Sequence, residues 1–140
     1  MRAIVSLPVL FALALGLGCD FLIFPDAYPY SEHYRHPLPT VAGISLFWLA
    51  LVLPFMCSLA LGCTRRRARV AVIPLAIVAG LTLTHTIMLV KDVAADPTTH
   101  NLVPFEYLYA WITVGIPAFI GSALARAICW ARDRRRTPSR

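Results

Sequence analysis

The sequence of 140 residues is short of charged side chains. Asp, Glu, Lys and Arg together make up 14% of the residues, while hydrophobic residues make up 59%. A soluble domain contains about 25% charged residues, and the mean hydropathy here is +0.69. Too few polar side chains remain to cover the surface of a water-soluble domain, so the composition indicates lipid as the solvent.

The sequence also has only four cysteines, and their positions provide no disulfide framework. Cys57, Cys63 and Cys129 are expected on the cytoplasmic half of the membrane, where thiols stay reduced, and Cys19 near the outer face. A disulfide-exchange enzyme would need outward-facing cysteine pairs, which this pattern lacks. We therefore expect the four cysteines to pack as small hydrophobic residues.

Four long apolar blocks make up most of the sequence. A membrane-spanning helix needs about 20 mostly apolar residues, and the blocks that meet this length are 3–24, 41–63, 70–90 and 104–130. They predict an all-α fold, a polytopic four-transmembrane-helix bundle that forms one domain over 1–140. The first block resembles a secretory signal ending at Cys19. Its apolar run continues to Phe24, however, so we expect a helix that is retained.

The basic residues predict the orientation of this bundle, because Lys and Arg accumulate in short cytoplasmic loops. With both termini inside, 11 of the 13 bases lie on the cytoplasmic side, mainly in residues 65–69 and in the basic tail 131–140. Only Arg35 and Lys91 lie outside. We expect a multi-pass protein of the bacterial inner membrane, N-in/C-in. Because each basic run adjoins an apolar segment, the lipid bilayer is the expected partner and nucleic acid is not.

Small residues and prolines predict how the helices pack. The short loop 64–69 predicts an antiparallel hairpin of the second and third helices. Prolines inside spans should kink or locally unwind them, and these are Pro54, Pro74 and Pro117. Small residues four positions apart allow helix backbones to approach closely in lipid, and the pairs with this spacing are Ala12/Gly16, Ala14/Gly18, Ala76/Gly80 and Gly121/Ala125.

His85 is the only ionisable residue well inside a predicted span, about 7 Å below the outer end of the third helix at 1.5 Å per residue. The threonines at positions 82, 84 and 86 add hydroxyl groups beside it. One interpretation is a neutral histidine that hydrogen-bonds a hydroxyl or a backbone carbonyl between helices. On this account, His85→Leu leaves the fold intact. The other is a proton relay or ligand contact. Glu106 should lie within side-chain reach of His85 if the third and fourth helices are neighbours.

The other candidate functional residues are expected on the outer side: Asp20 near the outer end of the first helix, and His100 and Asn101 in the second outer loop. The stretch from Asp96 to Glu106 resembles a segment of small uncharacterised four-helix bacterial inner-membrane proteins, and the resemblance implies no activity. The same residues predict a tight turn in which Pro104 opens the fourth helix.

The outer loops contain side chains of the types that bind metal ions. His33 and His36, three positions apart, could bind zinc or copper together with the outer carboxylates. No second spaced motif accompanies them. We therefore predict no metal ligand, no cofactor and no catalytic residue.

Three functions remain open from these residues. The first is a non-enzymatic accessory or interaction subunit, in a homo-oligomer or a larger membrane complex. The second is a small oligomeric transporter or channel, which His85 and the prolines would serve. The third is a membrane enzyme with outer-face carboxylates. Convergence of His85, Asp20 and Glu106 on a water-accessible cavity would favour the second and third functions, whereas a His85 bonded to a carbonyl in a dry interface would favour the first.

The orientation can be tested with a reporter that is active only in the cytoplasm. Fusions after Arg140 or within Arg65–Arg69 should be active, because the basic residues hold these segments inside. Fusions after Tyr30 or Thr98 should be silent. Activity at Thr98 together with silence at Arg140 would overturn the orientation.

Overall fold

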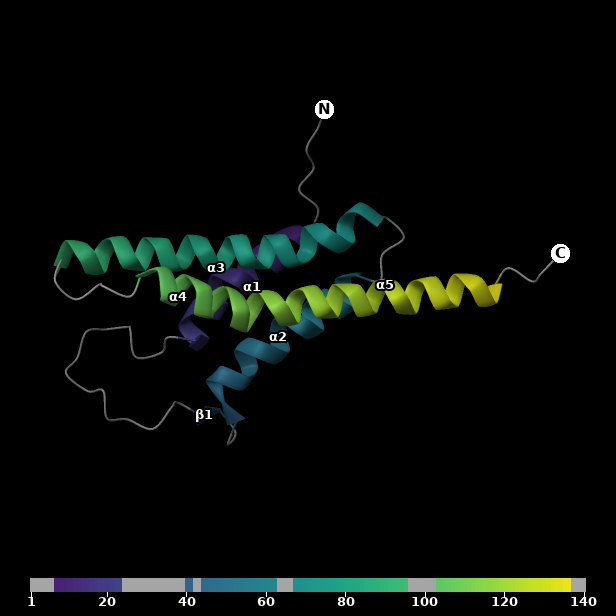
Figure 1. The fold of residues 1–140 in the computed structure, drawn as a ribbon, viewed down its shortest axis with the longest axis horizontal. Coiled ribbons are helices and arrows are strands. Elements are labelled where there is room, and N and C mark those ends of the chain that lie inside the picture. Colours follow the sequence, from purple (N-terminus) through teal and green to yellow (C-terminus); the bar gives the residue numbers. More distant parts are fainter. Residues whose placement is uncertain (1–6, 24–39, 42–43, 63–66, 96–102, 137–140) are drawn as a thin grey trace, which may run out of the picture.

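The computed structural model describes residues 7–23, 40–41, 44–62, 67–95 and 103–136. Within these ranges the chain is helical apart from one two-stranded antiparallel ladder, in which β1 (Thr40–Val41) pairs with β2 (Ile44–Ser45). The helical elements, drawn in Figure 1, are α1 (Leu7–Ile23), α2 (Leu46–Gly62), α3 (Arg67–Ala95), α4 (Val103–Ala110), the π-helical segment η2 (Trp111–Gly115) and α5 (Ile116–Arg136). The prediction of an all-α fold built from four long helical stretches is therefore confirmed in its main lines.

The helix boundaries differ from the predicted spans in two ways. The second span was predicted to begin at residue 41, but residues 40–41 and 44–45 are extended and the helix begins at Leu46. Thr40, Val41 and Ile44 are β-branched, and such side chains favour extended backbone over helix. The third and fourth stretches instead continue beyond the apolar blocks to Ala95 and Arg136, because Ala, Arg and Lys are good helix formers even where the chain is no longer apolar.

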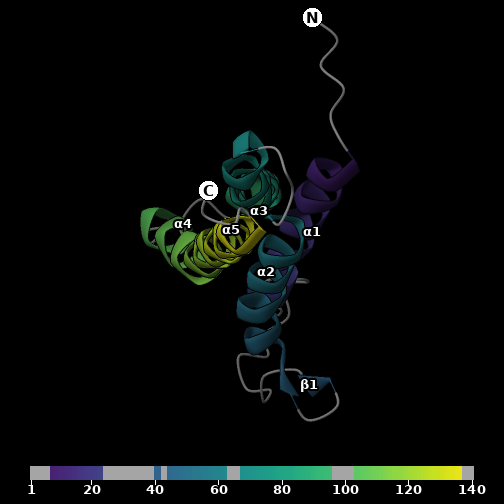
Figure 2. The same ribbon diagram turned by 90° about the vertical axis from the view of Figure 1, so that its right-hand side faces the viewer.

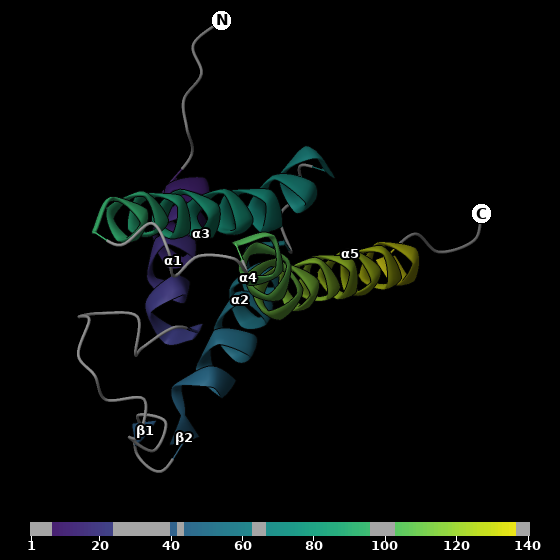
Figure 3. The ribbon, with the colours of Figure 1, turned by 60° about the vertical axis from the view of Figure 1, so that its left-hand side comes forward.

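Two helical stretches are long and apolar enough to cross a membrane, namely Ala71–Lys91 and Pro104–Arg135. The stretches Leu7–Ile23 and Trp48–Gly62 are apolar but shorter. The two short helices are steeply inclined to the two long ones (Figures 2 and 3).

The closest helix contact joins α1 to α3. A methyl group added to Gly16 would collide with the backbone carbonyl of Ile77, and one added to Gly80 would collide with the carbonyl of Leu13 and come within 2.9 Å of the Leu17 nitrogen. Only glycine permits two backbones to lie this close. The contacts Gly16–Ile77, Leu17–Thr84 and Asp20–His85 follow one another in the same direction along both helices, so α1 and α3 point the same way although they cross at a steep angle.

A second parallel pair joins α2 to α5. A methyl group on Gly121 would collide with the carbonyl of Phe55, and one on Gly62 would come within 2.8 Å of the Ala125 side chain. The predicted contact between the second and third helices is present, but α1 against α3 and α2 against α5 are the larger interfaces. Three of the four predicted small-residue pairs therefore lie in helix interfaces. The pair Ala14/Gly18 does not, since Ala14 is exposed and no atom lies within 4 Å of a methyl group added to Gly18.

The three prolines predicted to lie inside spans are all within helical stretches. Pro54 and Pro74 are buried within helices that continue past them. Pro117 is the second residue after the π-helical segment η2. A proline ring clashes with the carbonyl four residues earlier and removes one amide donor, and here that carbonyl belongs to Thr113 within η2. The wider π turn accommodates both effects, so the predicted local unwinding is observed at Pro117.

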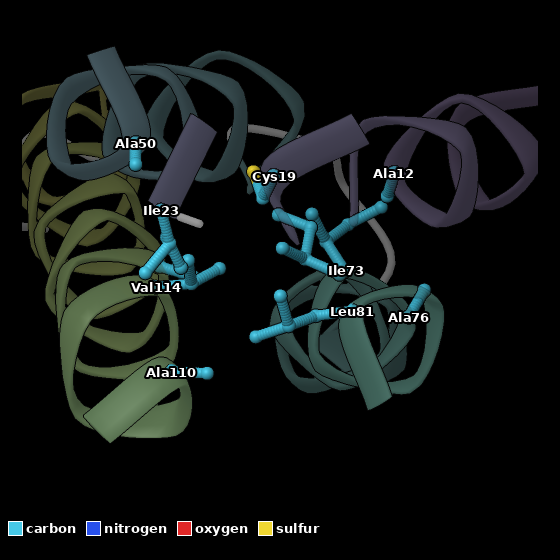
Figure 4. Close-up of a cluster of buried hydrophobic side chains, with 11 residues drawn as sticks. Ala12, Cys19, Ile23, Ala50, Ile73, Ala76, Leu81, Ala110 and Val114 are labelled. Carbon is cyan, nitrogen blue, oxygen red and sulfur yellow. The ribbon is translucent and has the colours of Figure 1, made fainter. Parts of the chain in front are cut away.

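The interior of the bundle is built from small side chains, and large apolar side chains lie on its outside. Alanines and a cysteine occupy much of the core between the helices, together with Ile73, Leu81 and Val114 (Figure 4). Among the large hydrophobic residues, Leu7 is 79% exposed, Phe105 67% and Val90 63%. Exposed apolar residues occur on all four helical stretches, which in water would create a large unfavourable surface.

Gly16 and Gly18 provide a matched test of the α1–α3 contact. Gly16→Leu should lower the stability of the protein in detergent by about 1–3 kcal/mol or more, because the added side chain must separate two backbones. Gly18→Leu adds the same atoms to the same helix where there is open space, and should have little effect. Equal losses, measured as unfolding midpoints, would show that α1 and α3 do not meet at Gly16.

Candidate functional site

The site is organised around a buried pair of ionisable residues on α1 and α3. Nδ1 of His85 and Oδ1 of Asp20 form a hydrogen bond of 3.0 Å. Asp20 is 0% exposed and His85 is 8% exposed. In the state with an ionised Asp20, the carboxylate can only accept a hydrogen bond, so the imidazole proton then lies on Nδ1.

The glycine contact explains why these two residues meet. Asp20 lies one turn beyond Gly16, and His85 lies just over one turn beyond Gly80. Between the glycines and the ionisable pair, the Thr84 hydroxyl lies 3.1 Å from the backbone oxygen of Leu17 on the other helix. The close backbone approach and this interhelical contact fix the register that places the imidazole on the carboxylate.

The hydrogen-bond partner of His85 differs from the one expected. One interpretation of the sequence has His85 hydrogen-bonded to a hydroxyl or a backbone carbonyl, and it places Asp20 at the outer face. The structure instead pairs His85 with a carboxylate from another helix. Sequence spacing alone could not reveal this partner, because it lies 65 residues away and depends on the rotation of α1 about its axis.

Glu106 approaches the opposite side of the imidazole from the first turn of α4. Its Oε2 lies 3.8 Å from His85 Nε2, and its side chain is 34% exposed. The expectation that Glu106 lies near His85 is therefore confirmed. At this distance the contact is electrostatic and longer than a direct hydrogen bond. One imidazole thus lies between a fully buried carboxylate and a partly exposed one.

Two aromatic residues of the α4–η2 stretch form one wall of the site. The ring of Tyr107 packs edge-on against His85 with centroids 4.6 Å apart. Its hydroxyl lies 2.8 Å from Thr86 Oγ1, and Trp111 Nε1 donates to Thr82 Oγ1 at 3.0 Å. These contacts join the α4–η2 stretch to α3 and place two aromatic rings beside the imidazole.

The hydroxyls of Thr82 and Thr86 already donate to backbone carbonyls within α3. Thr82 Oγ1 donates to the carbonyl of Val78 at 2.8 Å, and Thr86 Oγ1 donates to the carbonyl of Thr82 at 2.7 Å. Each hydroxyl has one proton, so its oxygen accepts from the aromatic partner. The Tyr107 hydroxyl therefore donates to Thr86. The sequence drew attention to the threonines but not to Tyr107 or Trp111, whose spacing of four residues matches that of Thr82 and Thr86.

The structure does not test the remaining predicted candidates. His100, Asn101, His33 and His36 lie outside the described residues. Within them, no group of three or more His, Cys, Asp and Glu side chains is arranged to hold a metal ion. The cysteines in helices are free thiols, and they are Cys19, Cys57 and Cys129; Cys63 is not described.

The arrangement can hold and pass a proton. Neutral imidazole has one N–H donor and one acceptor nitrogen, and it can accept a proton on one nitrogen while releasing one from the other. Here the donor faces Asp20 and the acceptor faces Glu106. No protein-family model, curated protein or solved structure matches this chain, so the interpretation of the site comes from its own geometry.

The Asp20–His85 pair changes the expected effect of His85→Leu. Loss of one partner of a buried ion pair costs about 3–5 kcal/mol, whereas replacement of both by apolar residues is often close to neutral. We expect His85→Leu and Asp20→Leu each to destabilise the protein strongly, and the double variant to be more stable than either. Unfolding of the four proteins in detergent measures the coupling. Additive losses would show that the two side chains do not interact.

Proposed function

We propose that this chain is a small polytopic protein of the bacterial inner membrane that binds and transfers protons through Asp20, His85 and Glu106, as a subunit of a proton-coupled transporter. The observation that carries the proposal is the imidazole of His85 between two carboxylates from two other helices. Ionisable residues are costly inside a bilayer, and those present there commonly mark proton or ion pathways.

The helix directions support four spans with both termini in the cytoplasm. The parallel pairs, α1 with α3 and α2 with α5, are those expected when successive helices alternate in direction across a membrane. The outward-facing large apolar side chains suit lipid on all four helical stretches. In this orientation Glu106, near the start of α4, lies at the outer side, and the helix end that carries the arginines lies at the cytoplasmic side.

Proton transfer in the site would begin at the exposed carboxyl group. Glu106 takes a proton from outer water and gives it to Nε2 of His85, while the Nδ1 proton passes to Asp20. The products are an ionised Glu106, a neutral imidazole protonated on Nε2 and a protonated Asp20. For net transport, Asp20 then releases its proton toward the cytoplasmic side, and the imidazole turns over so that its proton again lies on Nδ1 for the next cycle. The contact between Glu106 and Nε2 must shorten from 3.8 Å to hydrogen-bond length for this step.

The described surroundings of His85 contain few other titratable groups. Asp20 faces it from α1, and Glu106 and Tyr107 face it from α4. Cys19 is adjacent to Asp20 in α1 and is fully buried. Proton binding at this site should therefore depend on His85 and the two carboxylates.

Transport also requires that the site open to the other side, and η2 is suited to such a movement. This segment begins at Trp111, one of the two aromatic residues of the wall, and ends two residues before Pro117. π-helical turns often occur at functional positions. A four-helix chain has little interior for a conduction path, so we propose that it works as an oligomer.

The two alternative functions receive less support from the geometry. Burying an ionisable pair in an apolar interior is energetically unfavourable. The role of an accessory subunit does not require such a pair. An enzyme acting at the outer face needs carboxylates open to its substrate, and Asp20 is fully buried.

Proton flux into proteoliposomes tests the proposal. With an imposed pH gradient and a valinomycin-clamped potential, the wild type should accelerate acidification of the lumen. Asp20→Asn, His85→Phe and Glu106→Gln should each lower the rate at least tenfold, since each interrupts the transfer. Lys91→Gln, an exposed change at the end of α3, is the control and should keep the wild-type rate.

Circular dichroism and size-exclusion profiles would show whether each variant is folded. Wild-type flux no higher than that of empty liposomes, or equal flux in the wild type and in a folded Glu106→Gln variant, would refute proton transfer and favour the accessory role.

A further inference from the structure

The cytoplasmic end of α5 carries a concentrated positive charge. Residues 126–136 are one uninterrupted helical stretch, called the basic end of α5 below. It contains five arginines and one aspartate. Arg126, Arg132, Arg134 and Arg135 are all exposed. Figure 1 shows this end of the helix extending beyond the end of α3.

An exposed tryptophan lies within the same stretch. Trp130 is 56% exposed, and the guanidinium carbon of Arg134 lies 3.8 Å from the centroid of its ring. Such stacking holds the arginine along the helix one turn beyond the tryptophan. Tryptophan side chains concentrate at the level of the lipid headgroups, so Trp130 indicates the depth at which this helix leaves the membrane.

We propose that the basic end of α5 binds anionic phospholipid headgroups of the cytoplasmic leaflet. This inference uses the membrane orientation proposed above and is independent of proton transfer. The ligand is inferred from charge complementarity. The basic end of α5 has four exposed arginines, and in the proposed orientation they lie at the level of the negatively charged lipid phosphates. Arginine also binds phosphate by two parallel hydrogen bonds, which lysine cannot do.

The dimensions of the helix fit this location. The headgroup layer is about 5–7 Å thick on each side of the bilayer, and one helical turn covers about 5.4 Å. With Trp130 at the boundary, Arg134 and Arg135 lie within the headgroup layer. Arg126, one turn deeper, reaches the same layer by extending its side chain outward.

Native mass spectrometry of the full-length protein tests the proposal. Detergent-purified protein is incubated with equal amounts of phosphatidylglycerol and phosphatidylcholine of the same acyl chains, and the bound lipids are counted. The wild type should retain phosphatidylglycerol preferentially. The triple variant Arg132→Gln, Arg134→Gln, Arg135→Gln should lose this preference, with affinity falling about fivefold per arginine and about a hundredfold in total.

Two control variants separate this site from the rest of the protein. Lys91→Gln removes a positive charge from the opposite end of α3 and should leave the preference unchanged. His85→Phe should also retain it, so failure of the proton-transfer proposal would not imitate failure of this one. The variant Arg134→Lys keeps the charge but not the planar group, and should show intermediate affinity.

Several outcomes would overturn the proposal. These are equal retention of the two lipids by the wild type, an undiminished preference in the triple variant, and displacement of the lipid by millimolar inorganic phosphate, which would indicate a site for free phosphate. Tighter binding of a DNA oligonucleotide than of phosphatidylglycerol, lost in the same triple variant, would assign the basic end to nucleic acid instead.

Discussion

The close contact of α1 with α3 is the constraint on which the candidate site depends. At Gly16 and Gly80 neither helix has a side chain, so the two backbones meet directly. This contact sets both the distance and the register of the helices over the next turn, where Thr84 reaches the backbone of Leu17. Asp20 and His85 can therefore form a short hydrogen bond without extended side chains.

The environment gives that hydrogen bond its importance. Asp20 is fully buried, and a buried carboxylate is tolerated only when it is hydrogen-bonded or paired. Ionic and polar interactions are stronger where the dielectric is low, and an unmatched group is correspondingly costly. The pair thus specifies one rotation of α1 against α3, whereas apolar contacts alone would allow several.

The two ends of the bundle carry different kinds of polar residue. One end holds the ionisable site and the aromatic wall formed by Tyr107 and Trp111. The other end carries exposed arginines and Trp130 on α5. Since α4, η2 and α5 are one continuous helical stretch, a movement of η2 would change the position of Tyr107 and Trp111 relative to the arginine-bearing end of α5.

Composition and periodicity determined much about this protein. The four apolar blocks correspond to the four helical stretches, because long apolar segments without helix-breaking polar loops favour helix. The spacing of small residues correctly marked the faces of Gly16, Gly80 and Gly121, because close packing needs small side chains wherever it occurs. Depth along the helices was also sufficient to place Glu106 near His85.

Other features were decided only by the tertiary structure. Ala14 and Gly18 have the same spacing as Ala12 and Gly16, yet only the latter pair faces a helix, because rotation of α1 about its axis does not follow from spacing. The pairing of Asp20 with His85 follows from the same rotation. The extended residues before α2 and the wall formed by Tyr107 and Trp111 likewise depend on neighbours distant in sequence. Local pattern fixes which segments are helical and which are apolar, whereas the partners of their few polar side chains are fixed by how the helices pack.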